Sequence, residues 1–114
     1  MSRRDPVVYV RHMLDHAKEA VEMTHGRTRT DLDKNRMLNL AVVRLVEIVG
    51  ESCSRIPKEF RNEHPGIPWR EVSGVRVKLA HAYDSIDFDI LWDIVQNDLP
   101  TLIEQLKVLI EEKE

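Results

Sequence analysis

The sequence contains a single cysteine, Cys53, so the chain cannot form an intrachain disulfide. This favours a reducing compartment, because disulfides are used mainly in oxidising environments. No apolar run approaches the roughly 20 residues that a membrane-spanning helix needs. Residues 1–6 also lack the long apolar core of a secretory signal. These absences predict a cytoplasmic protein with no membrane partner.

An excess of positive charge is also absent. The chain has 17 lysines and arginines against 20 aspartates and glutamates, a formal net charge of −3. Nonspecific binding to a nucleic-acid backbone scales with the number of cationic contacts, so we expect no DNA binding. A small, locally positive cleft remains compatible with this balance. The chain has no internal repeat, and its 114 residues predict one domain over residues 1–114.

The sequence is rich in apolar residues that recur at helical spacing. A first helix is predicted with Asp5 as its N-cap and Pro6 in its first turn, ending at Gly26. A second is predicted to begin at Thr30 or Asp31, after a short polar linker. Its apolar stripe consists of Leu38, Ala41, Val42, Leu45, Ile48 and Val49. We expect this second helix to be the central helix of the domain.

Three residues near the end of the second helix need separate interpretation. Gly50 costs about 1 kcal/mol relative to alanine inside a helix, and its presence predicts that another backbone passes close by. Cys53 is predicted to be a small core residue, because no setting that would activate a nucleophile is visible. Glu51 is a candidate to brace a cleft, without a role that the sequence assigns.

The remaining chain predicts a short helical turn and two further long helices. Pro57 starts the turn, which ends at about Asn62, and a loop with two prolines follows. Pro68 opens a third helix, which is predicted to continue until Asp84 breaks it. Asp87 is predicted to cap the next element.

The last element is predicted from about Phe88 to Glu112 and contains Pro100. Because proline lacks the donor for a helical hydrogen bond, we expect a kink just before it or two helices in series. Together, these elements predict an all-α fold, an up-and-down bundle of four main helices with a short extra helical turn.

Arg76, His81 and Tyr83 gather a permanent cation, an imidazole and a phenol within eight residues. Arginine can hold a phosphate in a two-pronged grip, and histidine exchanges protons near neutral pH. On a straight helix Arg76 and Tyr83 share one face, but His81 lies about 140° around from Arg76. Either the helix loosens near its end, or a second protomer supplies the missing partner across a two-fold axis.

Taken singly, these residues also have plain interpretations. Arg76 can form a surface salt bridge, His81 can cap a helix end, and Tyr83 can be half-buried with a wet hydroxyl. His12 and His16 have the i, i+4 spacing of a metal-binding pair, but no further ligands follow at recognisable spacing. We therefore expect no metal site and no cofactor.

Three separated segments agree in order and spacing with one known family. They are IVGE at 48–51, GIPWREVSGVRVKLAHAY at 66–83 and LWDIVQNDLP at 91–100. They resemble the HepT-like proteins of the HEPN superfamily, which comprises helical nucleases and nucleotide-binding domains. The likeness extends from the first helix to about Leu109.

The resemblance implies a toxin component of a two-gene toxin–antitoxin module. Its partner is then a minimal nucleotidyltransferase similar to MntA, and its substrate is RNA, cleaved at the interface of a homodimer. Carried across residue by residue, Arg76 and His81 are the catalytic pair. Tyr83 is the position at which the partner attaches AMP and silences the toxin.

The chemistry is consistent with that assignment. His81 can take the proton of a ribose 2′-hydroxyl or deliver one to the leaving oxygen, and Arg76 can neutralise the phosphate. One residue departs from the family pattern, because Val77 stands where a polar residue, most often asparagine, usually follows the arginine. This favours an alternative, an inactive module that still binds the transferase or a nucleotide. A purely structural four-helix scaffold is a third possibility.

Overall fold

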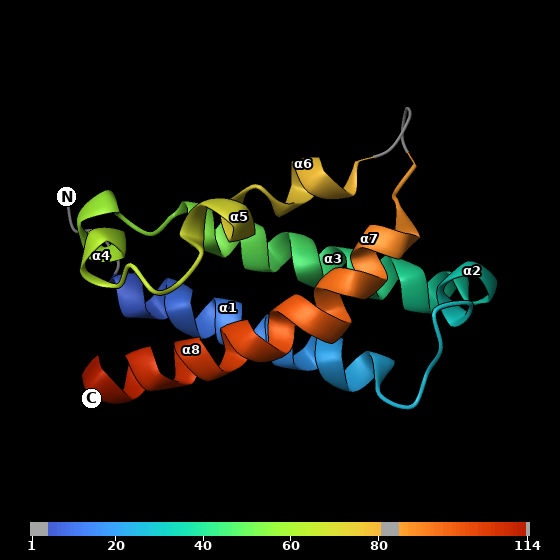
Figure 1. Ribbon diagram of the computed structural model, residues 1–114, viewed down its shortest axis with the longest axis horizontal. Coiled ribbons are helices and arrows are strands. Elements are labelled where there is room, and N and C mark those ends of the chain that lie inside the picture. Colours follow the sequence, from blue (N-terminus) through green and yellow to red (C-terminus); the bar gives the residue numbers. More distant parts are fainter. Residues whose placement is uncertain (1–4, 81–84, 114) are drawn as a thin grey trace.

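Two long amphipathic helices, α1 (Pro6–Thr24) and α3 (Arg36–Ser54), form the centre of the fold (Figure 1). The computed structural model describes residues 5–80 and 85–113 of the chain. Asp5 caps α1 as predicted, because its carboxylate accepts a hydrogen bond of 2.9 Å from the backbone N–H of Val7. Helix α1 packs against both α3 and α8 (Leu99–Lys113), which makes it the inner helix of a three-helix layer.

The C-terminal third is a series of helices rather than one straight rod. Helix α7 (Phe88–Asp93) leads into a turn of π-helix, η1 (Ile94–Asp98), and then into α8. The backbone N–H of Leu99 donates to the carbonyl of Ile94, five residues earlier, directly before Pro100. The predicted irregularity before this proline is confirmed, and it takes the form of two α-helices joined in series by a π turn.

The start of the second predicted helix was wrong. The structure has a separate short helix, α2 (Asp31–Lys34), and α3 begins only after Asn35. Asn35 is extended (φ −112°, ψ 98°), and its side-chain oxygen accepts from the N–H of Leu38 at 3.0 Å. Asparagine side chains compete with helical backbone bonds in this way, so Asn35 ends one helix and caps the next.

The third predicted helix was also wrong in its extent. It consists of two short helices, α5 (Trp69–Ser73) and α6 (Val75–Leu79), which are separated at Gly74. Ala80 is extended (φ −63°, ψ 134°), so the helix ends at Leu79 rather than at Asp84. Ala80 instead forms an isolated antiparallel bridge with Ile86. Tertiary pairing therefore ends the helix, although the apolar periodicity continues.

Other local predictions are confirmed. Helix α4 (Lys58–Glu63) is the short turn expected after Pro57. Asp87 caps α7, since its Oδ1 accepts from the N–H groups of Asp89 and Ile90 at 3.0 and 3.1 Å. The described part of the chain is all-α, with no named strand. No helix within residues 5–80 and 85–113 has the length and apolar character needed to cross a bilayer.

One core joins these helices. Its largest fully buried side chains come from α1, α2, α3, α6, α7 and α8 and from the segment after α3: Met13, Val46, Leu32, Ile56, Leu79, Leu91 and Leu106. Helices α5 and α6 pack along α3 (Figure 1), and residues of both helices line a pocket together with residues of η1 and α8. The short helix α6 is therefore held on the surface of the bundle by its contact with α3.

Gly50 makes that contact possible. A Cβ atom at this position would lie 2.7 Å from Cγ1 of Val75 and 3.1 Å from the backbone oxygen of Val72. Real Cβ contacts are essentially never shorter than 3.0 Å, so α5 and α6 lie where a side chain on residue 50 would be. The close backbone approach predicted from this glycine is confirmed.

We predict that Gly50→Ala destabilises the protein by about 1–2 kcal/mol, because the overpacking cost exceeds the gain in helix propensity. Gly66→Ala is the matched control, since a Cβ there meets nothing within 4 Å. Urea denaturation followed by circular dichroism measures both. A Gly50→Ala variant as stable as the wild type would show that α5 and α6 can move away at no cost.

Candidate functional site

Arg76 projects from the surface of α6, with 76% of its side chain exposed. Its Nε atom lies 4.0 Å from Oε2 of Glu47 on α3, which is a long contact for an ion pair. Exposed pairs of this kind contribute little to stability, so the guanidinium is free to exchange its partner for a ligand. The arrangement presents a permanent cation to solvent at the edge of the α3–α6 contact.

Glu47 belongs to a short chain of charges on α3. Arg44 lies 3.6 Å from Glu47 and donates to Glu51 at 3.0 Å. The hydrogen bond that Arg44 donates to Glu51, reinforced by the nearby carboxylate charges, raises the pKa of Arg44. Glu51, to which the sequence assigned no role, thus holds Arg44, which in turn neighbours the carboxylate that faces Arg76.

Sequence reasoning missed Glu47 as a neighbour of Arg76. The spacing of Arg44, Glu47 and Glu51 by three and four residues is a signal that they share one helix face. It could have predicted the ion pairs within α3 but not the pairing with Arg76. That contact depends on how α6 lies across α3, which only the folded structure shows.

His81 and Tyr83, the other two predicted site residues, lie outside the residues that the structure describes. The flanking residues are held together on both sides. The N–H of Asp87 donates to the carbonyl of Leu79 at 3.0 Å, next to the bridge between Ala80 and Ile86. Because α6 ends at Leu79, the rotation of 140° expected for a straight helix does not constrain Arg76 and His81.

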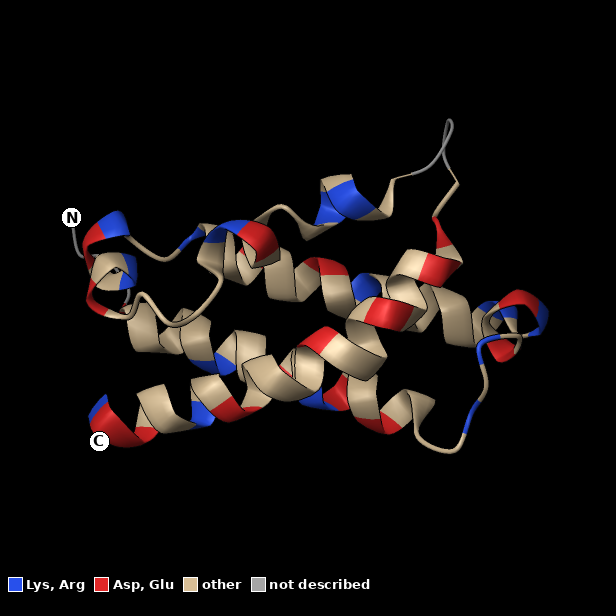
Figure 2. Cartoon of the chain, in the orientation of Figure 1, with Lys and Arg blue, Asp and Glu red and all other residues tan. Residues whose placement is uncertain are grey.

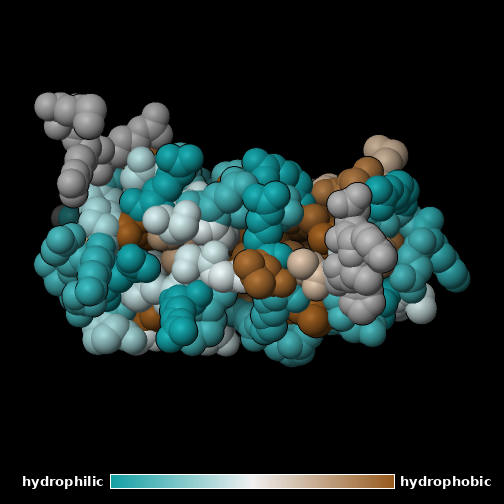
Figure 3. Space-filling view, turned by 90° about the horizontal axis from the view of Figure 1, so that it is seen from above, coloured by the Kyte–Doolittle hydropathy of each residue, from teal (hydrophilic) through white to brown (hydrophobic). Residues whose placement is uncertain are grey.

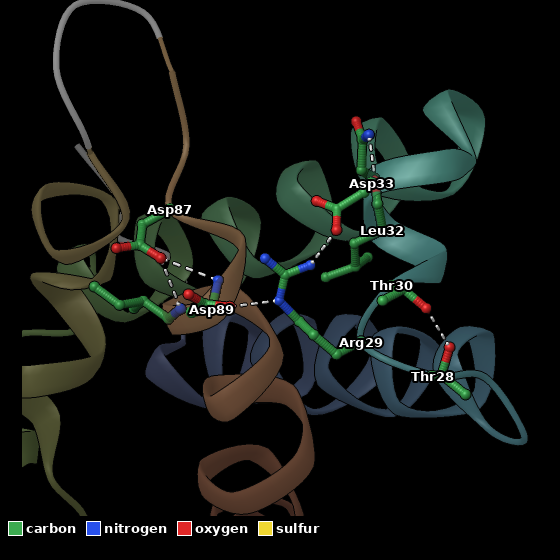
Figure 4. Close-up of polar contacts among 9 residues, drawn as sticks. Thr28, Arg29, Thr30, Leu32, Asp33, Asp87 and Asp89 are labelled. Carbon is green, nitrogen blue, oxygen red and sulfur yellow. Dashed lines mark hydrogen bonds and ion pairs between the residues drawn. The ribbon is translucent and has the colours of Figure 1, made fainter.

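Arg29 anchors the first turn of α7 to the region of α2. Its Nε donates to Asp89 at 2.7 Å and its Nη1 to Asp33 at 3.0 Å, so it links the turn before α2 to the first turn of α7 (Figure 4). Its guanidinium carbon also lies 6.0 Å from the ring centre of Phe88. The hydrogen bond to Asp89 is the main cause that raises the pKa of Arg29.

Exposed apolar side chains are found on α3, which carries Arg44 and Glu47, and on α6. Met37 and Leu40 on α3 are 83% and 52% exposed, and Val77 on α6 is 82% exposed. Met37 and Leu40 share the face of α3 that carries Arg44 and Glu47, since all four follow three- and four-residue spacing. Seen from the side of α5 and α6, hydrophobic surface gathers over the middle and one half of the molecule (Figure 3).

The other candidates from the sequence are structural. Nδ1 of His16 lies 2.6 Å from the carbonyl oxygen of His12, an interaction within α1. Within the described residues, no group of three or more histidine, cysteine, aspartate or glutamate side chains could hold a metal ion. The Cys53 thiol is buried and donates to the carbonyl of Trp69 at 3.3 Å, and burial raises its pKa to about 11. Cys53 is thus the core residue that the sequence predicted.

Comparisons with known proteins find relatives over most of the chain. Residues 13–109 match the family model described as Ribonuclease HepT-like. The chain is 34% identical to "Putative RNase TTE0752" of Caldanaerobacter subterraneus subsp. tengcongensis, over 96% of this chain and 98% of that protein. It is 34% identical to "Putative RNase MJ1380" of Methanocaldococcus jannaschii, over 96% of this chain and all of that protein.

A third relative is more similar over a shorter region. The chain is 40% identical to "Probable ribonuclease HepT" of Thermococcus cleftensis, over 78% of this chain and 84% of that protein. No solved structure matches the chain significantly. The family match includes α3, α6 and Arg76, so the exposed cation lies within the region shared with these relatives.

Proposed function

The chain belongs to the HepT-like ribonuclease family, and on that premise we propose that it is a metal-independent endoribonuclease. It acts as the toxin of a toxin–antitoxin module in the cytoplasm, as one HepT-like domain over residues 1–114. The observation that carries the proposal is Arg76. It is exposed, its ion-pair contact within the described residues is the 4.0 Å approach to Glu47, and it precedes His81 by five residues.

Arg76 and His81 divide the reaction between them. The ribose 2′-oxygen attacks the neighbouring phosphorus, and the bond from phosphorus to the 5′-oxygen breaks, which leaves a 2′,3′-cyclic phosphate. An imidazole of His81 takes the 2′-hydroxyl proton, and an imidazole gives a proton to the leaving 5′-oxygen. The guanidinium of Arg76 stabilises the negative charge that builds on the phosphate.

A homodimer completes this site. Three exposed apolar side chains, Met37 and Leu40 on α3 and Val77 next to Arg76 on α6, are costly to leave in water and can be buried by a second copy. An interface related by a two-fold axis brings the same surface of each copy together. It therefore places two copies of Arg76 and His81 near one cleft, so that one imidazole can accept a proton while the other donates one.

Tyr83 is the proposed site of control. A minimal nucleotidyltransferase similar to MntA transfers AMP from ATP to the phenol, which forms an oxygen–phosphorus bond and releases pyrophosphate. The added phosphate is anionic, and it competes with RNA for Arg76, seven residues earlier. The bulk of the nucleotide also blocks the cleft.

One observation favours a second function, that of an inactive module which only binds the transferase or a nucleotide. Val77, the residue after Arg76, is 82% exposed and offers no hydrogen bond to RNA or to an imidazole. In a relative with a polar side chain there, that group would face the same solvent region. RNA cleavage and AMP transfer distinguish the two functions.

We predict that the wild-type protein cleaves RNA in the presence of EDTA and leaves 2′,3′-cyclic phosphate ends. His81→Ala and Arg76→Gln should each lower the cleavage rate by about 10²- to 10⁴-fold, because each removes a group that acts in the transition state. His25→Ala, at an exposed histidine that follows α1, is the matched control and should retain full activity. Equal cleavage by dimeric His81→Ala would rule out the assignment.

We predict that Leu40→Asp weakens dimerisation by at least about tenfold, because two carboxylates would enter an apolar interface without partners. Val108→Asp on α8 is a matched control, since Val108 is 53% exposed and Leu40 is 52% exposed. Sedimentation velocity over a range of concentrations measures the dissociation constant. If both variants dimerise as the wild type does, the dimer does not use this face.

We predict that incubation with the cognate nucleotidyltransferase and ATP adds one AMP to the protein and abolishes RNA cleavage. Intact-mass spectrometry of Tyr83→Phe should show no addition. Tyr9→Phe, at the other of the two tyrosines in the chain, should be modified as the wild type is. Modification of both variants to the same extent would place the AMP elsewhere.

A further inference from the structure

A hollow with several cations in its lining lies between α4 and α5, and Arg76 is not part of that lining. It has a volume of about 750 Å³ and is lined by the loop at residues 65–68 and by side chains of the two short helices. We call it the α4–α5 hollow and define it by its polar lining residues, which are Lys58, Arg61, Asn62, Arg70 and Glu71. Three cations thus face one carboxylate, in a chain whose overall charge is negative.

The cations of the hollow have no ionic partner among the described residues. Lys58, Arg61 and Arg70 form no ion pair within residues 5–80 and 85–113. By contrast, Arg29 and Arg44 are each held by two carboxylates. The positive charge of the hollow is therefore available to a ligand, whereas that of Arg29 and Arg44 is used within the fold.

The nearby carboxylates of α4 do not neutralise the hollow. Glu63, at the end of α4, pairs with Lys113 of α8 at 3.7 Å. The same lysine lies 5.3 Å from the ring centre of Phe60, which holds it in place. Glu59 is exposed and does not line the hollow. Among the described lining residues, Glu71 is the one carboxylate, so the net charge of the lining is positive.

Arg61 carries one side-chain donor that the described residues do not satisfy. Its Nε atom is buried and has no hydrogen-bond partner in the structure. A buried donor without a partner costs about 1–3 kcal/mol, and more when the group is charged. Arg61 lines the hollow beside Lys58 and Arg70. Arginine donors match phosphate oxygens in geometry and charge, so this lining suits a phosphate.

The hollow and Arg76 belong to neighbouring short helices. Helix α5, which carries Arg70, is separated from α6, which carries Arg76 and Lys78, only by Gly74. Positively charged segments appear on α4, α5 and α6 along one side of the molecule (Figure 2). A flexible single strand that passes over α5 would therefore meet cations at both ends of its path.

We propose that the α4–α5 hollow binds backbone phosphates of the RNA substrate at a distance from the scissile bond. This inference rests on the proposed ribonuclease function. Contacts to phosphates position a nucleic acid without reading its sequence, so the cations of the hollow favour longer substrates. The hollow raises the affinity for RNA that spans both sites and leaves the chemical step at Arg76 and His81 unchanged.

The test uses the double variant Lys58→Gln, Arg70→Gln, since both side chains are exposed and their loss should not unfold the protein. On a long single-stranded RNA the variant should raise KM by about three- to tenfold, with kcat unchanged. Cleavage of a dinucleotide, which cannot reach the hollow, should be unaffected. The slope of log Kd against log salt for long RNA, measured by fluorescence anisotropy, should fall by about 0.7 for each cation removed.

A matched control removes cations that lie outside the hollow. Lys18→Gln, Arg27→Gln changes exposed residues of α1 and of the following loop and should alter neither KM nor the salt slope. If both double variants weaken RNA binding equally, net charge is the cause and the hollow is not a site. An unchanged KM on long RNA with weaker binding of the transferase would assign the hollow to a protein partner, which overturns the proposal.

The two proposals fail in different ways. If the wild-type protein cleaves neither the long RNA nor the dinucleotide, the ribonuclease function is wrong and the inference falls with it. If it cleaves both and the Lys58→Gln, Arg70→Gln variant has an unchanged KM and an unchanged salt slope, only the hollow is wrong. Single substitution of Arg61 by glutamine, with stability checked by thermal denaturation, should give the same change in KM as either exposed cation.

Discussion

The contact of α5 and α6 with α3 at Gly50 is the constraint on which the rest of the site depends. The backbone oxygen of Val72 and the side chain of Val75 occupy the space that a Cβ at residue 50 would need. This fixes how close α6 lies to α3, and so it sets the distance between Arg76 and Glu47. A helix of only five residues has little stability alone, so its position comes from this packing rather than from its own hydrogen bonds.

The parts of the fold that follow local rules could be predicted from the sequence. Asp5 and Asp87 cap helices because their carboxylates reach backbone donors within three residues, and Pro100 disturbs its helix because it lacks a donor. Gly50 signals a close approach because glycine is otherwise unfavourable inside a helix. For the caps and the proline, the sequence within a few residues contains the whole physical cause. At Gly50 the sequence signals the contact, but the residues that make it lie more than 20 positions away.

The parts that were wrong or missed depend on residues far apart in the chain. Periodicity extends the third helix beyond Leu79, but the bridge between Ala80 and Ile86 and the bond from Asp87 to Leu79 end it there. The pairing of Glu47 with Arg76 and the charge of the α4–α5 hollow also arise only when separate helices meet. Arg76 could be predicted as a site residue from the family resemblance, whereas its surroundings could not.

The acidic composition of the chain and a role in binding RNA are compatible because of how the charges are paired. Within residues 5–80 and 85–113, Arg29 and Arg44 are paired with carboxylates, while Lys58, Arg61 and Arg70 form no ion pair. Net charge therefore underestimates the attraction of one surface. A few phosphate contacts bind weakly, which agrees with the absence of a broad basic surface. Two protomers would double those contacts on a strand long enough to reach both, because the second contact becomes intramolecular once the first has formed. Dimerisation would then supply affinity as well as the second imidazole.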